Sequence, residues 1–277
     1  QLIYYCDNKN RMFQKHPVKK VEAIVPEKKT TVKDTGTPGP LVVPTTTTSH
    51  DGVLTTEGVL YYTNQARQKN GGFSPLTRNA KLDQSAHIKL QDMFEKQYFD
   101  HISPLGRGPA DLADFVGYQY VVVGENLALG MFENDSALVD AWMNSPGHRA
   151  NILNLHYTEI GISAEKGTYE GREVWISVQS FGMPLSACPP LDGTMKEQIV
   201  KNNSEINSIQ SALEARLQRV ENASKADPNY NTYVDEYNEL AKTYNALVAT
   251  NKGLADTYNA QVRAFNACLH DTTSPQH

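Results

Sequence analysis

Hydrophobic positions recur at helical spacing in two stretches of the central chain. The first begins near Thr55 and reaches the stop signal Gly71-Gly72, and the second runs from about Asp83 to Tyr98. In both, apolar side chains lie three or four positions apart, as on one face of a helix. The face of the second helix consists of Leu82, Ala86, Leu90, Met93 and Phe94. A third helix is predicted from Ser136 to Asn144, capped by Asp135 or Ser136 and ended by Pro146.

Strand-like patterns follow these helices. Residues 159–164 and 174–181 are rich in β-branched and aromatic side chains, and the turn-like residues 166–171 separate them. We expect an antiparallel pair that backs a helical layer. The short apolar run Val121-Val122-Val123 leads into Gly124-Glu125-Asn126. These elements predict one globular domain over about residues 52–185.

The pattern changes after Cys188. One amphipathic helix is predicted to end before Asp227-Pro228, with Ile199, Ile206, Ile209, Leu213, Leu217 and Val220 along its face. A seven-residue repeat follows in the next segment. It places Tyr230, Tyr237, Tyr244, Asn251, Tyr258 and Phe265 at one heptad position, and Tyr233, Leu240, Leu247 and Leu254 three residues further on. Because one helix cannot bury this stripe alone, we predict an antiparallel coiled hairpin in which Asn251 fixes the register.

The cysteines support a hairpin. Cys188 and Cys268 are nearly equidistant along the chain from the predicted turn at Asp227-Pro228, so folding there brings them level. We predict a disulfide between them, and hence an oxidising, extracytoplasmic setting. Cys6 is left over, either free or paired between chains.

The ends of the chain have a different composition. Residues 1–34 carry a local excess of basic side chains, and residues 25–51 are rich in Pro, Thr and Gly, which favours an extended linker. We therefore divide the chain into a basic tail with linker at 1–51, the globular domain at 52–185, the hairpin at 186–271 and a tail at 272–277. Since the sequence begins at Gln1 rather than Met, we expect processing or truncation, and whether a signal peptide or an anchor preceded Gln1 stays open.

Charge and hydropathy exclude some partners by default. A formal net charge of −5 and a pI near 5.9 provide no broad basic field, so we expect no nucleic-acid partner. No apolar run reaches the roughly 18–20 residues of a membrane helix, so we expect no transmembrane segment in this chain.

The candidate chemistry lies between His101 and His148. His101, Glu125 and His148 each stand among turn residues rather than inside a regular hydrophobic run. Two imidazoles and a carboxylate can bind a divalent cation such as zinc with an open position, or act as a general acid and base. A structural role, in which the histidines cap turns and Glu125 accepts backbone hydrogen bonds, is the alternative. From the pattern alone the two possibilities are balanced.

Many short motifs in a fixed order resemble the bacterial branch of the CAP superfamily, also called SCP-like extracellular proteins. They are Asn64-x-x-Arg67, Gly72-Phe73-Ser74-Pro75-Leu76, Leu82 with Ala86, Phe99-Asp100-His101-x-Ser103-Pro104, Gly124-Glu125-Asn126, Trp142-x-x-Ser145-Pro146-Gly147-His148-Arg149-x-Asn151-Ile152-Leu153, Glu159-Ile160-Gly161-Ile162 and Gln179-x-Phe181-Gly182. The resemblance covers about residues 56–183. It implies secretion, a central cleft and an α+β fold: a CAP-type α-β-α sandwich, here followed by the hairpin and preceded by an extended tail.

The resemblance also implies a site. The family's cleft is lined by two histidines and two glutamates, of which His101, Glu125 and His148 match three. Ser145 stands where eukaryotic relatives have the second glutamate, and Glu159 is a possible substitute. Ser103 and Ser145 are interpreted as turn residues and Asn126 as a turn residue that bonds the backbone. No nucleophile with an activating motif accompanies the histidines.

These observations predict a secreted or cell-surface protein whose cleft binds a ligand or a divalent cation, with the hairpin as spacer or assembly element. The expected partners are a cell-surface component, a lipid or a protein, and the chain could assemble with itself through the hairpin or the tail. Alternatives are a protease-like hydrolase at the same cleft and a structural subunit of an extracellular assembly. The sequence leaves enzymatic activity open and favours binding over bond cleavage.

Overall fold

The computed structural model describes residues 3–6, 12–15, 38–43 and 52–271. These residues fall into two compact units. The first contains 38–43, 52–188 and 268–271, and the second contains 189–267 with the strands near the N-terminus. The predicted domain boundaries remain a prediction, but residues 38–43 of the predicted linker belong to the first unit.

A five-stranded sheet forms the centre of the first unit. Its order is β3 (Leu41–Val42), β5 (Tyr120–Gly130), β7 (Arg172–Pro184), β6 (Glu159–Tyr169) and β4 (Thr77–Arg78). The three long strands pair antiparallel, whereas the short edge strands β3 and β4 pair in parallel with β5 and β6. The predicted antiparallel pair is thus present as β6 and β7.

The strands are longer than their sequence patterns suggested. β6 and β7 extend through most of the predicted turn region and reverse at Glu170-Gly171, where both residues have positive φ (48° and 74°). β5 continues from the short apolar run through Gly124-Glu125-Asn126 to Gly130. Asn126 therefore lies in a strand rather than in the predicted turn.

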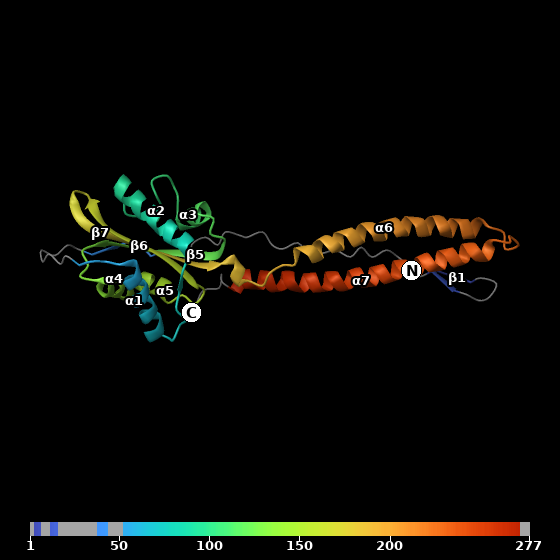
Figure 1. The fold of residues 1–277 in the computed structure, drawn as a ribbon, viewed down its shortest axis with the longest axis horizontal. Coiled ribbons are helices and arrows are strands. Elements are labelled where there is room, and N and C mark those ends of the chain that lie inside the picture. Colours follow the sequence, from blue (N-terminus) through green and yellow to red (C-terminus); the bar gives the residue numbers. More distant parts are fainter. Residues whose placement is uncertain (1–2, 7–11, 16–37, 44–51, 272–277) are drawn as a thin grey trace. The chain divides into compact units, whose positions relative to one another are not determined.

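Helices cover both faces of this sheet (Figure 1). α2 (Ala80–Lys96) and α3 (Pro109–Phe115) lie on one face, and α1 (Thr56–Lys69), α4 (Asp135–Asn144) and α5 (Pro146–Ile152) lie on the other; the 3-10 turn η1 (Leu185–Ala187) follows β7. The α+β class and the α-β-α sandwich are confirmed. The cap of α4 differs from the prediction, because Asn134 accepts a hydrogen bond from the Ala137 amide.

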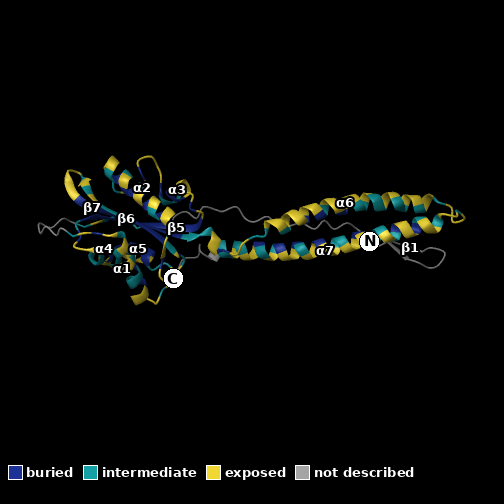
Figure 2. Cartoon of the chain, in the orientation of Figure 1, coloured by how far each residue is buried: buried dark blue, intermediate teal, exposed yellow. Residues whose placement is uncertain are grey.

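Successive side chains of β5 point to opposite faces of the sheet and pack into the two halves of the core. Leu127 and Leu129 pack with Leu90 of α2, whereas Ala128 packs on the opposite side with Trp142 of α4. Figure 2 shows the result: the sheet is largely buried, and exposed residues lie on the outer faces of the helices. Side chains of β5 thus meet elements from both helical layers.

The second unit contains a helical pair, α6 (Gly193–Asn222) and α7 (Tyr230–Asp271). The first heptad position of α7 is buried as predicted at Tyr237, Tyr244, Asn251 and Tyr258. Its partner row is Val234, Ala255 and Val262, whereas the predicted Leu240, Leu247 and Leu254 are only half-buried. Asn251 is fully buried and donates to Asn203 of α6 at 2.8 Å, as a register-fixing residue would.

The predicted disulfide is present. Cys188 and Cys268 are bonded, with their Cα atoms 5.7 Å apart. Near the N-terminus, β1 (Ile3–Cys6) and β2 (Met12–Lys15) form an antiparallel pair. The side chain of Cys6 lies outside what the structure describes. Among the described helices, none combines the length and apolar character needed to cross a membrane.

Candidate functional site

His101 and Glu125 form a buried pair. His101 lies in the turn after α2, and Glu125 lies in β5 with its side chain on the same face of the sheet. The His101 Nδ1 atom is 2.8 Å from Glu125 Oε1, and the two side chains are only 7% and 1% exposed. Two residues that the sequence singled out are therefore in direct contact.

The other ring nitrogen of His101 faces the predicted linker. His101 Nε2 lies 2.6 Å from the backbone carbonyl oxygen of Pro38. A carbonyl can only accept, so Nε2 carries a proton. The pair at Nδ1 holds a second proton, shared between the imidazole and Glu125.

His148 lies in α5 and is 1% exposed. Its Nδ1 atom is 2.8 Å from the Ser145 hydroxyl, at the junction of α4 and α5. Burial, reinforced by the nearby charge of His101 and opposed by the Leu127 backbone, lowers the pKa of His148 to about 4. His148 is therefore neutral at physiological pH, and Ser145 orients its ring as well as forming the predicted turn.

Two buried polar atoms at this site have no protein partner among the described residues. They are Glu125 Oε2, beside the bonded oxygen, and His148 Nε2. Buried polar atoms in folded proteins nearly always have a partner. These two atoms are the places where a bound polar group would find unused hydrogen-bonding capacity.

A buried amide network joins Glu125 to His148. Asn126 donates to the backbone carbonyl of His148 at 3.2 Å and to Gln179 at 3.1 Å. Asn151 donates to the carbonyl of Glu125 at 3.1 Å and to the Asn126 side chain at 3.0 Å. The prediction that Asn126 bonds the backbone is confirmed, and its partner is the second histidine.

A buried lysine supports the His101 turn. Lys89 of α2 is 1% exposed and donates to the His101 carbonyl at 2.8 Å and to the Tyr98 hydroxyl at 3.2 Å. Burial lowers the pKa of Lys89, against the attraction of Glu125. The sequence analysis missed this residue. The signal was present, because Lys89 lies three positions after Ala86 and four before Met93, on the apolar face of its helix.

Two other predicted residues have structural contacts. Glu159 accepts hydrogen bonds from the Tyr118 hydroxyl at 2.7 Å and from Asn79, the α2 cap, at 3.1 Å. That carboxylate oxygen thus joins β6 to the N-cap of α2 and to Tyr118, which lies between α3 and β5. Ser103 shapes its turn as predicted, because its hydroxyl accepts from the Arg107 amide at 3.1 Å.

The predicted metal site can be compared with this geometry. Among the described residues, no group of three histidine, cysteine, aspartate or glutamate side chains is arranged to hold a metal ion. Both ring nitrogens of His101 are engaged, so of the potential ligand atoms of the three side chains only Glu125 Oε2 and His148 Nε2 lack a partner among the described residues. As arranged, the three side chains do not fit a divalent cation unless Pro38 moves.

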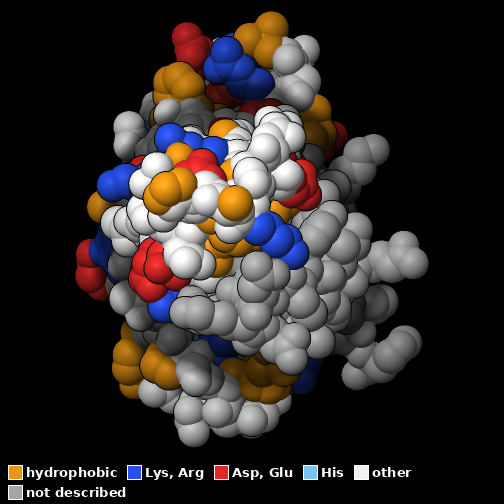
Figure 3. Space-filling model, turned by 90° about the vertical axis from the view of Figure 1, so that its right-hand side faces the viewer, with side chains coloured by type: hydrophobic (Ala, Val, Ile, Leu, Met, Phe, Trp, Pro, Cys, Tyr) orange, Lys and Arg blue, Asp and Glu red, His pale blue; other side chains and the backbone are white. Residues whose placement is uncertain are grey.

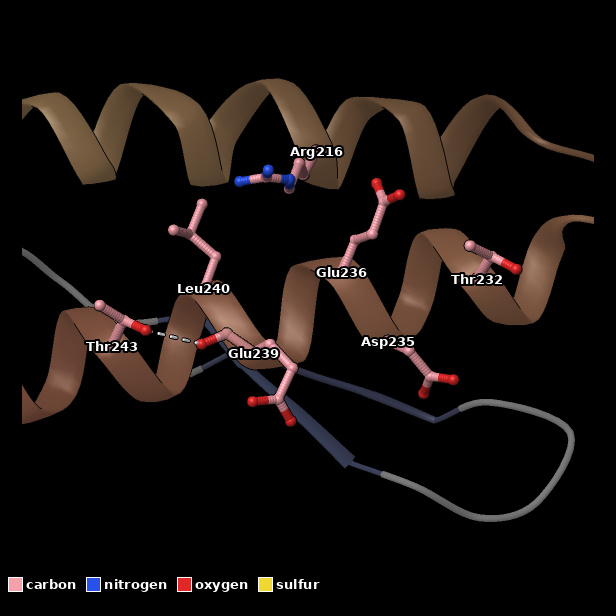
Figure 4. A pocket seen from close by; sticks show the side chains of 7 residues that line it. All are labelled: Arg216, Thr232, Asp235, Glu236, Glu239, Leu240 and Thr243. Carbon is pink, nitrogen blue, oxygen red and sulfur yellow. Dashed lines mark hydrogen bonds between the residues drawn. The ribbon is translucent and has the colours of Figure 1, made fainter.

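The helical pair has a surface hollow of about 560 Å³. Arg216 of α6 lines it from one side, and α7 contributes the other residues (Figure 4). Leu240 points toward α6, whereas Asp235 and Glu239 point away from it. On the face drawn in Figure 3, acidic and basic side chains of the described residues are interspersed rather than gathered by sign. Neither surface concentrates polar groups in a buried setting as the His101 region does.

The fold and the buried His–Glu pair define a class: α-β-α sandwich domains with a histidine beside a carboxylate of a central strand. The profile of the CAP family, described as the cysteine-rich secretory protein family, matches residues 60–181. Residues 60–181 of this chain are a CAP domain.

Each individual relative matches only part of this chain. YkwD of Bacillus subtilis is 40% identical over 167 residues, covering 57% of this chain and 63% of YkwD. The membrane protein YlbC of B. subtilis is 31% identical over 111 residues, covering 40% of this chain and 32% of YlbC. A solved extracellular protein with an SCP domain from Bacillus anthracis is 26% identical, covering 46% of this chain and 39% of that protein, with a TM-score of 0.39. The chain thus spans less than two thirds of each.

Proposed function

We propose that this chain is a binding protein that works outside the cytoplasm and takes its ligand at the His101–Glu125 site of the CAP domain. The observation that carries the proposal is the pair of buried polar atoms without a protein partner, Glu125 Oε2 and His148 Nε2. Leaving such an atom unpaired costs about 1–3 kcal/mol, so a ligand that bonds it gains affinity from the same term. A fold that maintained this cost without a ligand would gain nothing from it.

The extracytoplasmic location rests on the Cys188–Cys268 disulfide. Structural disulfides persist in oxidising compartments and are rare in the reducing cytoplasm. The family description, cysteine-rich secretory protein, agrees with this location.

We propose that the helical pair acts as a spacer or assembly element. At 1.5 Å per residue, the 30 residues of α6 and the 42 residues of α7 correspond to helices of about 45 and 63 Å. Their buried residues form the contact between the two helices, and the outward residues are mostly polar. Such a pair contributes length.

The test is thermal unfolding of the whole chain with three classes of ligand: Zn²⁺, a library of short peptides and anionic phospholipid vesicles. Glu125→Gln and His148→Gln alter the site, and Glu165→Gln, whose side chain is 40% exposed on β6, is the matched control. A ligand at 100 times its Kd stabilises by about 2.7 kcal/mol. For a domain of this size that raises the Tm by roughly 5 °C or more.

We expect one class to raise the Tm of the unmodified chain and of Glu165→Gln, and to have much less effect on Glu125→Gln. The proposal fails if no class raises the Tm, or if the rise is the same in Glu125→Gln. A response to Zn²⁺ alone would assign the site to a cation. Peptide cleavage that Glu125→Gln abolishes would instead support the hydrolase alternative.

A further inference from the structure

The geometry points to an extended peptide as the ligand of the His101–Glu125 site, with residues 38–43 of this chain as its occupant in cis. The inference rests on the proposed function for the location of the site, but it assigns a different polar contact: residues 38–43 bond His101 Nε2 and leave Glu125 Oε2 and His148 Nε2 unpaired. It goes further in assigning the contacts that recognise the peptide and in requiring that the chain's own segment leave before another peptide binds.

Backbone pairing is the first contact. Leu41 and Val42 pair in parallel with Ala128 and Leu129 at the edge of the sheet, and the Val43 amide donates to the Leu129 carbonyl at 2.9 Å. Without this segment, β5 would be an edge strand with unpaired backbone groups. Addition of a peptide strand to such an edge is a general mode of peptide recognition.

The side chains of the segment alternate as a bound strand requires. Leu41 and Val43 pack against the core cluster that contains Trp142, whereas Val42 between them is 58% exposed. In peptide recognition by strand addition, the backbone provides affinity and pockets for alternate side chains provide specificity. The inward positions of this segment are both aliphatic.

The two ends of the segment are held where glycines make room. A Cβ atom on Gly147 would lie 2.5 Å from Pro38 Cβ, and one on Gly130 would lie 2.7 Å from the Val43 carbonyl oxygen. All three of the closest atoms to the Gly147 position belong to Pro38. The surface beside His148 is therefore shaped for a proline ring.

Pro38 also provides the polar contact. Its carbonyl accepts from His101 Nε2 at 2.6 Å, and His101 is held by Glu125 and by Lys89 under its turn. Because His101 Nε2 donates to a backbone carbonyl, the buried His–Glu pair recognises the main chain of the peptide rather than a side chain. Pro38 and Pro40 lack amide protons and have a fixed φ, so they favour an extended backbone and leave the pairing with β5 to residues 41–43.

These contacts define the ligand chemically. It is an extended peptide with a proline whose carbonyl meets His101, followed three residues later by two aliphatic side chains in alternate positions. The segment Pro38-Gly39-Pro40-Leu41-Val42-Val43 meets this description.

The test uses the full chain and a fluorescein-labelled peptide with the sequence of residues 37–44. Leu41→Asp with Val43→Asp removes the two inward, partly buried anchors from the chain's own segment, while Val42→Asp places a charge at the exposed position between them. Binding is measured by fluorescence anisotropy. Hydrogen exchange over residues 38–43 reports whether the segment has left the sheet.

We expect the double variant to exchange faster and to bind the peptide at least tenfold more tightly than the unmodified chain or Val42→Asp. Adding Gly147→Ala to the double variant should weaken peptide binding at least tenfold, because the methyl group takes the place of the proline ring. His101→Ala in the same background should also weaken it.

Two results overturn the inference. One is a double variant whose segment exchanges freely but which binds no peptide. The other is a segment that stays protected from hydrogen exchange when Leu41 and Val43 are both replaced by aspartate. Residues 38–43 would then be a fixed strand of the domain and not an exchangeable occupant. If the peptide fails while another ligand class stabilises the chain through Glu125, only the peptide assignment falls. If no ligand depends on Glu125, the proposed function falls with it.

Discussion

Replacing His148 by glutamine should remove most of the pH dependence of CAP-domain stability between pH 6.5 and 4. His148 is 1% exposed, and burial together with the charge of His101 lowers its pKa from 6.5 to about 4. Glutamine keeps a polar group near the Ser145 hydroxyl but cannot take up a proton. The substitution therefore isolates one titration.

The sign and size of this pH dependence follow from the linkage between protonation of His148 and folding. The unfolded chain binds a proton at this position at a higher pH than the folded chain does, so stability is complete above pH 6.5 and falls as the pH is lowered toward 4. A shift from 6.5 to about 4, at about 1.4 kcal/mol per unit, corresponds to roughly 3 kcal/mol in total. About 2 kcal/mol of this is lost by pH 5.

The assay is urea unfolding followed by tryptophan fluorescence at pH 7.5, 6, 5 and 4.5. The chain has two tryptophans, Trp142 and Trp175, and both are buried in the first unit, so the signal reports on the CAP domain. His87, which is 55% exposed on α2, provides the control substitution His87→Gln. It should keep the steep pH dependence of the unmodified chain.

The reasoning is refuted if unmodified chain and His148→Gln lose stability in parallel from pH 7.5 to 4.5. That outcome would mean that His148 takes up a proton in the folded state as readily as in the unfolded chain. A steeper dependence in His148→Gln would mean that the charged imidazole stabilises the fold, contrary to its buried setting.

Three further outcomes are expected. Asn126→Ala removes the centre of the buried amide network and should lower the unfolding free energy by about 2–4 kcal/mol, since partners left unpaired cost about 1–3 kcal/mol each; a loss below about 0.5 kcal/mol in the tryptophan assay would contradict it. Cys188→Ser with Cys268→Ser opens a closure of 80 residues and should cost about 4–5 kcal/mol in the chain-entropy treatment. Circular dichroism at 222 nm during urea unfolding measures this, and an unchanged midpoint would argue against it. Asn251→Asp puts a carboxylate at a fully buried position beside Asn203 and should destabilise the helical pair by several kcal/mol at pH 7, with recovery below pH 4; equal helical melting at both pH values would count against that placement.

The sequence predicted the fold well where local periodicity carries the information. The 3.6-residue spacing located α1 and α2, and the cysteine positions located the base of the helical pair. The strand ends were underestimated, since β5 and β7 are buried on both faces and their polar residues interrupt the apolar runs. Gln179 of β7 is an example: it is fully buried, yet polar, because Asn126 donates to it.

The contacts of the site could not be predicted from the sequence, for a different reason. His101 and Glu125 could be named from their motifs, but the position of Pro38 depends on pairing between segments more than 80 residues apart, such as Leu41 with Ala128. Propensity favours no strand in a Pro-rich segment, and only a two-residue pairing results. Tertiary pairing here overrides the linker interpretation.

Protonation decides between binding and bond cleavage at this site. The Ser145 hydroxyl and His148 are placed like a nucleophile and its base, 2.8 Å apart. A general base works best with a pKa near the working pH, and the pKa of His148 is about 4. Relative to an ordinary histidine, accepting the serine proton costs roughly 3 kcal/mol more, or about two orders of magnitude in rate.

His101 cannot replace His148 as that base. Its Nε2 proton is donated to the Pro38 carbonyl, and its Nδ1 is bonded to Glu125, so neither nitrogen offers a free lone pair. While residues 38–43 remain in place, both ring nitrogens of His101 are in hydrogen bonds and Nε2 acts as a donor. This is expected of a recognition site rather than of a general base. Hydrolysis here would first require Pro38 to leave, so the variant that releases the segment is also the one in which an activity would be seen.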